Sequence, residues 1–592
     1  MRYSTLPTKP TTRDMIQQFG GYNHNMRIGS GEFYDMMNLT SSYFPLLAPR
    51  QERGFYTGGG NISGMIAKDQ LCYVDGQDFV IGSQHVNMDL TDDEKTLVSM
   101  GAYVVIWPDR KFINTVDIED RGDVEATMQT TANIRFSLCN ANVESYGTPH
   151  ISDQEPSLEQ MESIKYWLDT SVTPHQLKQY STATGMWIAT ATTYIKIESP
   201  GIGKLFAKGD GVEISGLKDV ALVGADGETF TDEEIAAIDG SFVLHAREDD
   251  YIVITGMLST VRTITNTITI SRTMPEMDFV IESGNRLWGC RYGLDAKGEY
   301  VNQIYASKLG DFKNWKCFEG VSTDSYYANC GTDGHFTGAV THLGYPLFIK
   351  EECMHKVYGS YPAQYQIQTT SCRGVQKGSH KSLAIVGEIL YYKSRLGVCA
   401  FDGSLPTEIS VNLGDVAYSQ AVGGAHGRKY YITMKDTGGT YHLFVYDAEK
   451  GLWHKEDNLQ VTCFCSHGNE MYYLDSGTGQ IRTMLGSGTS LEKQVPWMAQ
   501  TGLMGVDDPY KKYISRLQIR MQLKPESTVK IYMEYDSSGQ WEYVCTMKGT
   551  DLRSFNLPVK PRRCDHMKLK MEGKGYARVF SIGKTIEQGS GY

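Results

Sequence analysis

The sequence has little cysteine and no long apolar run. Its 12 cysteines in 592 residues are too sparse for a disulfide scaffold, so reduced and buried thiols are expected. No stretch approaches the 18 consecutive apolar residues from which a membrane-spanning helix is inferred. Residues 1–19 are polar and lack the apolar centre of a secretory signal peptide. These absences argue against a disulfide-rich secreted domain and against a helical membrane protein.

The charge balance is acidic. Lys and Arg total 57 against 69 Asp and Glu, which gives a net charge of −12 and argues against a protein that coats nucleic acid broadly. Hydrophobic residues make up 41% of the chain and charged residues 21%, so the chain can fill a core. The length is several times that of one domain, which predicts three to four domains or one large repeated body.

Glycine and tyrosine are abundant, with 61 and 37 residues, and short aromatic or β-branched runs lie between the glycines. Each run is shorter than an ordinary helix and is bounded by turn residues. Examples are Leu71–Gly76, Ala102–Trp107, Arg286–Gly293, Tyr345–Lys350 and Ile389–Ser394. This pattern predicts an all-β fold.

The glycines that open these runs recur at a nearly constant spacing. In the second half of the chain the steps between them are 43, 40 and 41 residues. A period of about 40–50 residues is typical of β-propeller blades, which repeat because one small sheet cannot bury both of its faces alone. The clear units open at Gly344, Gly387, Gly427 and Gly468, and weaker ones at Gly64, Gly101 and Gly284. We therefore predict a β-propeller of about seven blades, with six to eight open.

The spacing also predicts an insertion. Gly101 and Gly284 lie 183 residues apart, far more than one blade needs. The inserted module is predicted as α+β or β-barrel-like, because residues 157–168 have helical spacing and later runs alternate like strands. The predicted segments are an extended N-terminal segment (1–60), a first propeller part (61–116), the inserted module (117–277), a second propeller part (278–495) and a C-terminal β-sandwich (496–592).

Catalytic and phosphate-binding motifs are missing. No Gly-x-Ser-x-Gly occurs, and Gly374–Ser382 has the wrong glycine spacing for a phosphate loop, so a turn before a strand is expected there. On a strand, Cys463, Cys465 and His467 would share one face, as three metal ligands could. Structural zinc sites need wider gaps and a fourth ligand, so thiols packed between blades are expected instead.

Three further groups have the same structural interpretation. Cys353 and His355 are expected in a core, and Arg247–Tyr251 lacks the spacing of a calcium loop and predicts a solvated turn. Asp447–Trp453 lacks the aspartate box of sialidases, and its tryptophan is expected to pack between blades. The sequence thus predicts no catalytic, no cofactor-binding and no metal-ligating residue, no cofactor, and a protein that is not an enzyme.

The stretch Gly20–Gly54, with its Pro-Leu-Leu and Arg-x-x-Arg-Gly, is the most distinctive of the chain. It resembles the opening of propeller-like virion proteins of tailed bacteriophages and prophages of gut Firmicutes. Supporting segments are Asn285–Gly293, Asn302–Trp315, Gly374–Gly403 and Ile514–Leu523. Tail-hub or neck proteins of short-tailed phages are the nearest in kind, although such hubs need no large insertion.

The resemblance implies a structural virion protein that docks tail and neck components through its propeller. It implies a homo-oligomeric ring, assembly in the host bacterial cytoplasm, and no membrane or specific nucleic-acid partner. Residues 1–28 hold few apolar positions and are expected to lie extended across a neighbouring subunit or a partner protein. Two alternatives stay open, namely a receptor-binding tail protein that recognises carbohydrate and a propeller glycoside hydrolase.

Overall fold

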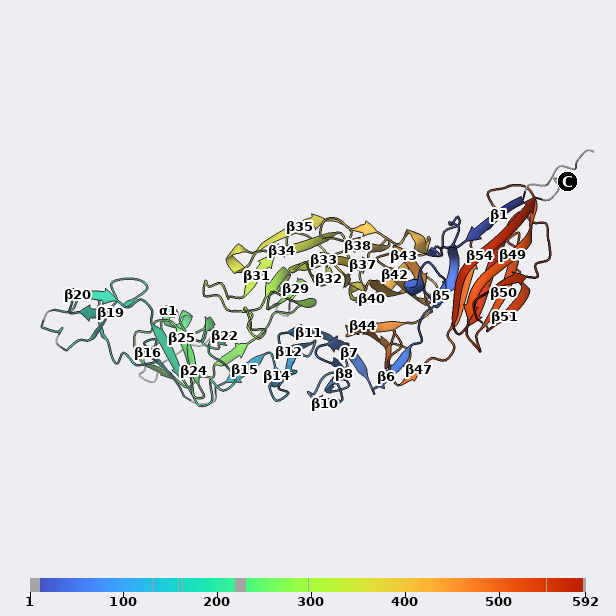
Figure 1. Cartoon of the computed structure of the whole chain (residues 1–592). Coiled ribbons are helices and arrows are strands. Elements are labelled where there is room, and N and C mark those ends of the chain that lie inside the picture. Colours follow the sequence, from blue (N-terminus) through green and yellow to red (C-terminus); the bar gives the residue numbers. More distant parts are fainter. Residues whose placement is uncertain are drawn as a thin grey trace, which may run out of the picture. The chain divides into compact units, whose positions relative to one another are not determined.

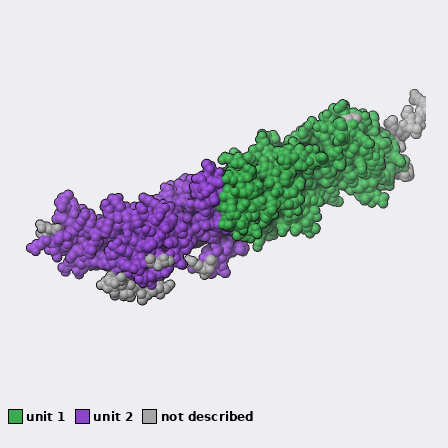
Figure 2. Space-filling model, turned by 90° about the horizontal axis from the view of Figure 1, so that it is seen from below, with its two compact units in different colours: residues 1–97, 336–356, 369–592 green, residues 98–335, 357–368 purple. Residues whose placement is uncertain are grey.

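The structure is a computed structural model that describes residues 11–130, 133–157, 159–161, 163–218, 230–295, 298–549 and 551–588. The chain divides into two compact units, one of residues 1–97, 336–356 and 369–592 and the other of residues 98–335 and 357–368 (Figure 2). Strands dominate both units (Figure 1). The described residues contain one α-helix, α1 (Asp232–Ala236), and four 3₁₀ turns: η1 (Ser41–Tyr43), η2 (Pro362–Gln364), η3 (His380–Ser382) and η4 (Val411–Leu413).

Seven sheets of antiparallel strands, six with four strands and the last with five, follow one another along the chain, which confirms the predicted β-propeller. In order, they are β7 (Ile62–Ala67), β8 (Leu71–Asp75), β9 (Asp78–Ile81), β10 (Gln84–Asn87); β11 (Thr96–Met100), β12 (Tyr103–Trp107), β13 (Lys111–Asn114), β14 (Arg121–Asp123); β28 (Phe279–Ser283), β29 (Arg286–Leu294), β30 (Tyr300–Ala306), β31 (Tyr326–Asn329); β32 (Phe336–His342), β33 (Tyr345–Lys350), β34 (Cys353–Tyr358), β35 (Gln366–Ser371); β36 (Ala384–Val386), β37 (Ile389–Lys393), β38 (Val398–Phe401), β39 (Thr407–Glu408); β40 (Tyr418–His426), β41 (Lys429–Asp436), β42 (Tyr441–Asp447), β43 (Leu452–Lys455); and β44 (Val461–His467), β45 (Glu470–Asp475), β46 (Gln480–Thr483), β6 (Gly54–Gly58).

The recurring glycine has a defined place in the sheets. Gly284, Gly344 and Gly427 each lie in the two-residue turn between the first and second strands, with φ of 61°, 79° and 59°. Such tight hairpin turns need a positive φ at their first or second position, which glycine adopts without strain. These repeats therefore start inside a turn when they are counted from the glycine, and the first strand of the sheet precedes it. Gly64 differs, because it lies within the first strand β7 itself.

The seventh sheet is completed from the other end of the chain. Its fourth strand is β6, which pairs with β46 on one side and with the edge strand β47 (Ser490–Leu491) on the other. In the first unit, the first strands of successive sheets are neighbours: β36 contacts β40, β40 contacts β44, and β44 contacts β7. The last sheet is thus next to the first, and an N-terminal strand closes the repeat.

The inserted module follows β14, so it begins after residue 123 and not at the predicted residue 117. It holds three sheets: β15 (Ala126–Gln129), β27 (Thr269–Arg272), β22 (Gly211–Ser215), β23 (Gly240–Val243); β24 (Ala246–Glu248), β25 (Tyr251–Thr255), β21 (Tyr194–Glu198), β16 (Ile134–Cys139), β26 (Arg262–Ile264); and β17 (His150–Ser152), β18 (Tyr166–Asp169), β19 (Gln176–Ser181), β20 (Met186–Ala189).

The predicted helix over residues 157–168 is wrong. Turns cover Gln160 and Met161, and β18 takes Tyr166–Asp169 and pairs with β17 and β19; residues 158 and 162 lie outside the described residues. Trp167 and Leu168 are buried there. Pairing with two strands outweighs the helical spacing, which is a weak preference.

The C-terminal β-sandwich is confirmed, with strands that the sequence did not assign to it. Its sheets are β1 (Thr11–Ile16), β54 (Ala577–Gln588), β49 (Lys512–Leu523), β52 (Arg553–Leu557); and β2 (Gly21–Tyr22), β3 (Glu32–Met37), β48 (Pro496–Thr501), β53 (Met567–Lys574), β50 (Thr528–Tyr535), β51 (Glu542–Lys548). A small pair, β4 (Leu39–Thr40) and β5 (Ala48–Pro49), follows β3. Three strands of the sandwich therefore come from the N-terminal stretch.

The expectation that residues 1–28 lie across a neighbouring subunit is wrong for residues 11–28, and residues 1–10 lie outside the described residues. β1 pairs with β54 over its full length, and Ile16, Phe19 and Tyr22 are buried. An edge strand gains main-chain hydrogen bonds that need few apolar side chains, so composition alone concealed it. The same hydrophobic core runs from propeller residues such as Trp453 to sandwich residues such as Trp497.

Candidate functional site

The cysteines of β44 pack between the seventh and first sheets. Cys463 and Cys465 lie against a core that includes Ile62 and Tyr73, and burial raises the pKa of the two thiols to about 11 and about 12. The ring of His467 contacts the Asp69 carbonyl at 3.2 Å. Within the part of the chain that the structure describes, no three His, Cys, Asp or Glu side chains are placed to hold a metal ion. The prediction of thiols packed between blades is confirmed.

Cys353 and His355 meet inside the fourth sheet. The Cys353 Sγ lies 3.7 Å from His355 Nε2, and His355 Nδ1 lies 2.9 Å from the Thr369 hydroxyl. His355 is fully buried, and burial lowers its pKa to about 4. The imidazole is therefore neutral at neutral pH and belongs to the core, as the sequence predicted.

The two predicted turns are confirmed. Gly374–Ser382 runs through η3 into β36, and Ser382 is buried with its hydroxyl donating to the Ser379 carbonyl. Arg247–Tyr251 forms the hairpin turn between β24 and β25, where an Asp250 carboxylate oxygen accepts a hydrogen bond from the Gly201 amide at 2.8 Å.

Asp447–Trp453 joins the sixth sheet to its neighbours. The Trp453 ring is 1% exposed, and its Nε1 donates to the Ile409 carbonyl beside the fifth sheet at 2.7 Å, which confirms packing between blades. Asp447 accepts a hydrogen bond from the Ser41 hydroxyl at 2.6 Å and pairs with Lys450 at 3.1 Å. Burial disfavours the Asp447 carboxylate, yet these partners outweigh burial and lower its pKa.

The Arg-x-x-Arg-Gly of the N-terminal stretch forms a buried ion-pair cluster, which we call the closure latch: Arg50, Arg53, Glu456, Asp457 and Glu492. Arg53 contacts Glu456 at 2.6 Å and Asp457 at 2.7 Å, and Arg50 contacts Glu492 at 2.7 Å. Both arginines are less than 9% exposed. The carboxylates come from the end of the sixth sheet and from the segment that follows the seventh.

Gly54 of the same motif starts the closing strand. A Cβ at this position would lie 1.8 Å from the Ser487 carbonyl oxygen, so only glycine lets the backbones approach. The Arg-x-x-Arg-Gly motif therefore fixes the position of β6. Its two arginines bind neighbouring carboxylates, and its glycine packs closely against the segment that follows β46.

Beside the latch is an open cavity of about 510 Å³, here called the arginine cavity. It lies between the N-terminal stretch, the segment after β46 and the edge of the sandwich, all in the first unit. Its charged and aromatic lining residues are Tyr43, Arg50, Glu52, Lys524, Glu526, Tyr576 and Arg578.

Two cations of the cavity are held by aromatic rings. The Arg578 guanidinium lies 4.3 Å from the Tyr43 ring centre and 5.3 Å from that of Tyr576. The Lys524 ammonium lies 4.5 Å from the Tyr576 ring. Among the described residues, neither cation has a carboxylate within ion-pair distance, and the buried Arg578 Nε lacks an acceptor. Lys524 and Arg578 thus contact no carboxylate of the described residues, although Glu52 and Glu526 also line the cavity.

Sequence reasoning missed these residues. Tyr43 and Arg578 are more than 500 positions apart, and only Tyr43 lies in a distinctive stretch, Gly20–Gly54. Their meeting depends on the isolated bridge between Leu47 and Val579, which brings the N-terminal stretch to β54. Only the closeness of Tyr43 to the distinctive Arg-x-x-Arg-Gly marks the region in the sequence.

No family model matches the sequence, and the search of curated proteins found no match. Among solved structures, the β-propeller domain of the Trilobed protease from Pyrococcus furiosus matches at 12% identity and a TM-score of 0.24, over 53% of this chain and 91% of that one. The exo-β-1,3-galactanase of Phanerochaete chrysosporium matches at 9% identity and 0.19, over 52% and 94%. The sialidase of Trypanosoma rangeli matches at 10% and 0.20, over 90% and 95%.

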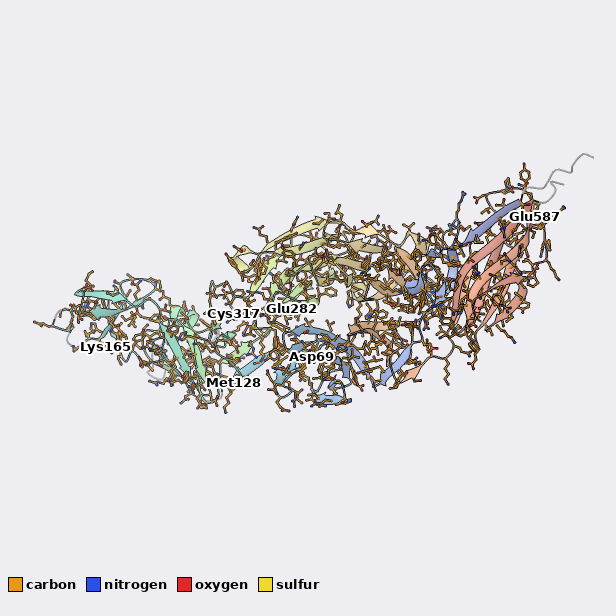
Figure 3. The ribbon with its side chains drawn as sticks, in the orientation of Figure 1. Asp69, Met128, Lys165, Glu282, Cys317 and Glu587 are labelled. Carbon is orange, nitrogen blue, oxygen red and sulfur yellow. The ribbon has the colours of Figure 1, made fainter. Side chains whose placement is uncertain are left out.

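These matches contradict the prediction that the chain is not an enzyme, because several of the matched structures are glycoside hydrolases. Scores at this level assign no reaction, substrate or catalytic residue to this chain. The first strands of the seven sheets carry one carboxylate, Glu282 of β28 (Figure 3). No helix of the described residues is long and apolar enough to cross a membrane.

Proposed function

We propose that this chain is a structural protein of a tailed-phage virion, in which the propeller and the sandwich dock tail and neck proteins. The observation that supports this most is the continuous core of the first unit, which contains side chains of both modules. A shared core joins the fifth and sixth sheets of the propeller to the sandwich within the first unit, as a protein that transmits position between neighbours needs. The N-terminal stretch that carries the phage resemblance is the segment that joins them.

The contacts of this stretch with the sixth sheet are dense and polar. The Asn38 amide donates to the Glu456 carbonyl at 2.9 Å, and the Asn38 side chain donates to the Pro496 carbonyl at 2.9 Å. Lys455 pairs with Asp35 at 3.1 Å. One short segment, residues 35–38, therefore binds both β43, the outer strand of the sixth sheet, and β48, a strand of the sandwich.

The proposal includes a closed ring of copies, assembled in the host cytoplasm on a preceding neck component. Closed symmetry is the usual state of homo-oligomers, and a net charge of −12 favours separate soluble subunits before assembly. Light scattering of the purified chain should then report mainly monomer at low salt.

Imaging of purified particles tests the role. We expect the chain to copurify with capsid and connector proteins and to form a ring on the tail axis. Copies at fibre tips, together with binding to a glycan array, would favour the receptor-binding alternative. Release of reducing sugar from host cell wall by the purified chain would favour the hydrolase alternative.

A further inference from the structure

We infer that the arginine cavity is a binding site for a carboxylate, supplied by an acidic side chain of a partner protein. The inference deepens the docking role and rests on it only for the identity of the partner. It starts from Arg578, whose guanidinium is enclosed by Tyr43 and Tyr576 and has no counter-ion among the described residues.

The aromatic rings determine what the guanidinium can still do. A guanidinium stacked on a ring has its face covered, and its hydrogen-bonding edge stays available. That edge carries N–H donors in a fixed fork that matches the two oxygens of a planar carboxylate. Stacking on Tyr43 and Tyr576 also restricts the side chain before a ligand arrives, which lowers the entropy lost on binding. The arrangement is therefore preorganised for a bidentate acceptor.

The Arg578 Nε–H, which has no acceptor among the described residues, also supports binding of a carboxylate. The Arg578 Nε is buried and makes no hydrogen bond within the described chain, and a buried donor without an acceptor destabilises its surroundings. The neighbouring Lys524 adds a second cation that is also on Tyr576. A carboxylate seated here would meet both positive groups.

Acidic side chains at the rim of the arginine cavity determine which kind of anion can bind there. Glu52 and Glu526 line the same cavity and are exposed. They would repel a polyanion such as a nucleic-acid backbone, and the net charge of −12 adds to this. A single carboxylate on a side chain can pass between them. A cavity of about 510 Å³ is large enough for an acidic side chain with its flanking residues.

Binding of a labelled peptide of alternating glycine and glutamate to the full chain at low salt tests the inference by fluorescence anisotropy. We expect Arg578→Ala to weaken binding about tenfold or more, as loss of a charged hydrogen bond does, and Arg578→Lys to restore part of it. The matched control is Arg520→Ala, which removes an exposed arginine from β49 of the same sandwich. A peptide with glutamine in place of glutamate should bind about tenfold more weakly than the acidic one.

Equal binding by wild type and Arg578→Ala, or no binding of the acidic peptide to wild type, would overturn the site. Displacement of the peptide by inorganic phosphate at lower concentration than by acetate would overturn the choice of carboxylate. Unfolding of Arg578→Ala in urea is measured alongside, and a wild-type curve keeps the binding result interpretable. None of these measurements uses particles, so the site can fail while the virion role holds, and the reverse.

Discussion

Arg50 belongs to both the closure latch and the arginine cavity, but the two regions differ in whether their other cations form ion pairs. Arg53 is buried against two carboxylates of its own chain, whereas Arg578 lies against two tyrosines and forms no ion pair with the described residues. A buried charge whose counter-ions come from the same chain holds the fold together. A charge that is held in position without one is available to a partner.

Removing the paired arginine should have the largest effect. We expect Arg53→Ala to lower the free energy of unfolding by about 3–5 kcal/mol, because Glu456 and Asp457 would lose their nearest counter-charge and keep only Arg50, at 3.6 Å from each. Urea unfolding followed by tryptophan fluorescence measures it. A loss of less than about 1 kcal/mol, as for an exposed pair, would remove the contrast between the two regions.

Truncating a buried side chain that carries no charge tests how much stability comes from packing alone. Trp453→Ala should cost about 3–5 kcal/mol, because a buried ring that fills the space beside Tyr446 is lost. This loss should be the same at low and high salt. Trp541→Ala, which truncates a partly exposed ring, is the control and should cost less. Near-wild-type stability of Trp453→Ala would place that ring outside the core.

Acid should weaken the latch. Burial alone would raise the pKa of Asp457 and Glu492, but Arg53 and Arg50 outweigh it and hold both below their ordinary values. A carboxyl group with a lowered folded-state pKa stabilises the fold above its unfolded-state pKa, and that contribution is lost as pH falls through the folded-state value. Stability of the wild type should therefore fall below about pH 4. Urea curves across this window should fall less steeply for Arg53→Ala, and parallel slopes would count against the ion pairs.

The smallest effect on stability is expected at the cavity. Arg578→Ala removes two cation–π contacts and no ion pair, so unfolding should change by about 1 kcal/mol or less. Thermal and urea unfolding check it. A loss as large as that of Arg53→Ala would show that the chain itself uses this charge.

Much of the fold was predictable because its signal is local. The turn glycines Gly284, Gly344 and Gly427 mark their sheets, since each hairpin needs a positive φ at a fixed place. Strand alternation after residue 496 likewise identified the sandwich. The closing strand β6 has no such signal, because it pairs with β46 more than 400 residues away and lies outside the repeat.

The sites were harder to predict for the same reason. The thiols of Cys463 and Cys465 could be assigned to a core, because alternation fixes which face a strand residue takes. The sequence marked Arg53 as part of a motif. It gave no indication that Glu456 and Asp457 would be the ion-pair partners of Arg53. Tyr43 and Arg578 meet through folding alone, so no spacing in the sequence connects them.

The closing strand β6 also determines when the seventh sheet can form during synthesis. During synthesis β6 is made long before β46, and at about 5–20 residues per second the wait is roughly 20–85 s. Over that time the strands of residues 11–58 have no partners from the later part of the chain, and unpaired strand edges invite association with other chains. The strands β1 and β3 wait longer, because their partners β54 and β48 follow residue 483 in the chain. Binding of a chaperone to the nascent N-terminal segment until residue 588 has emerged is the expected consequence.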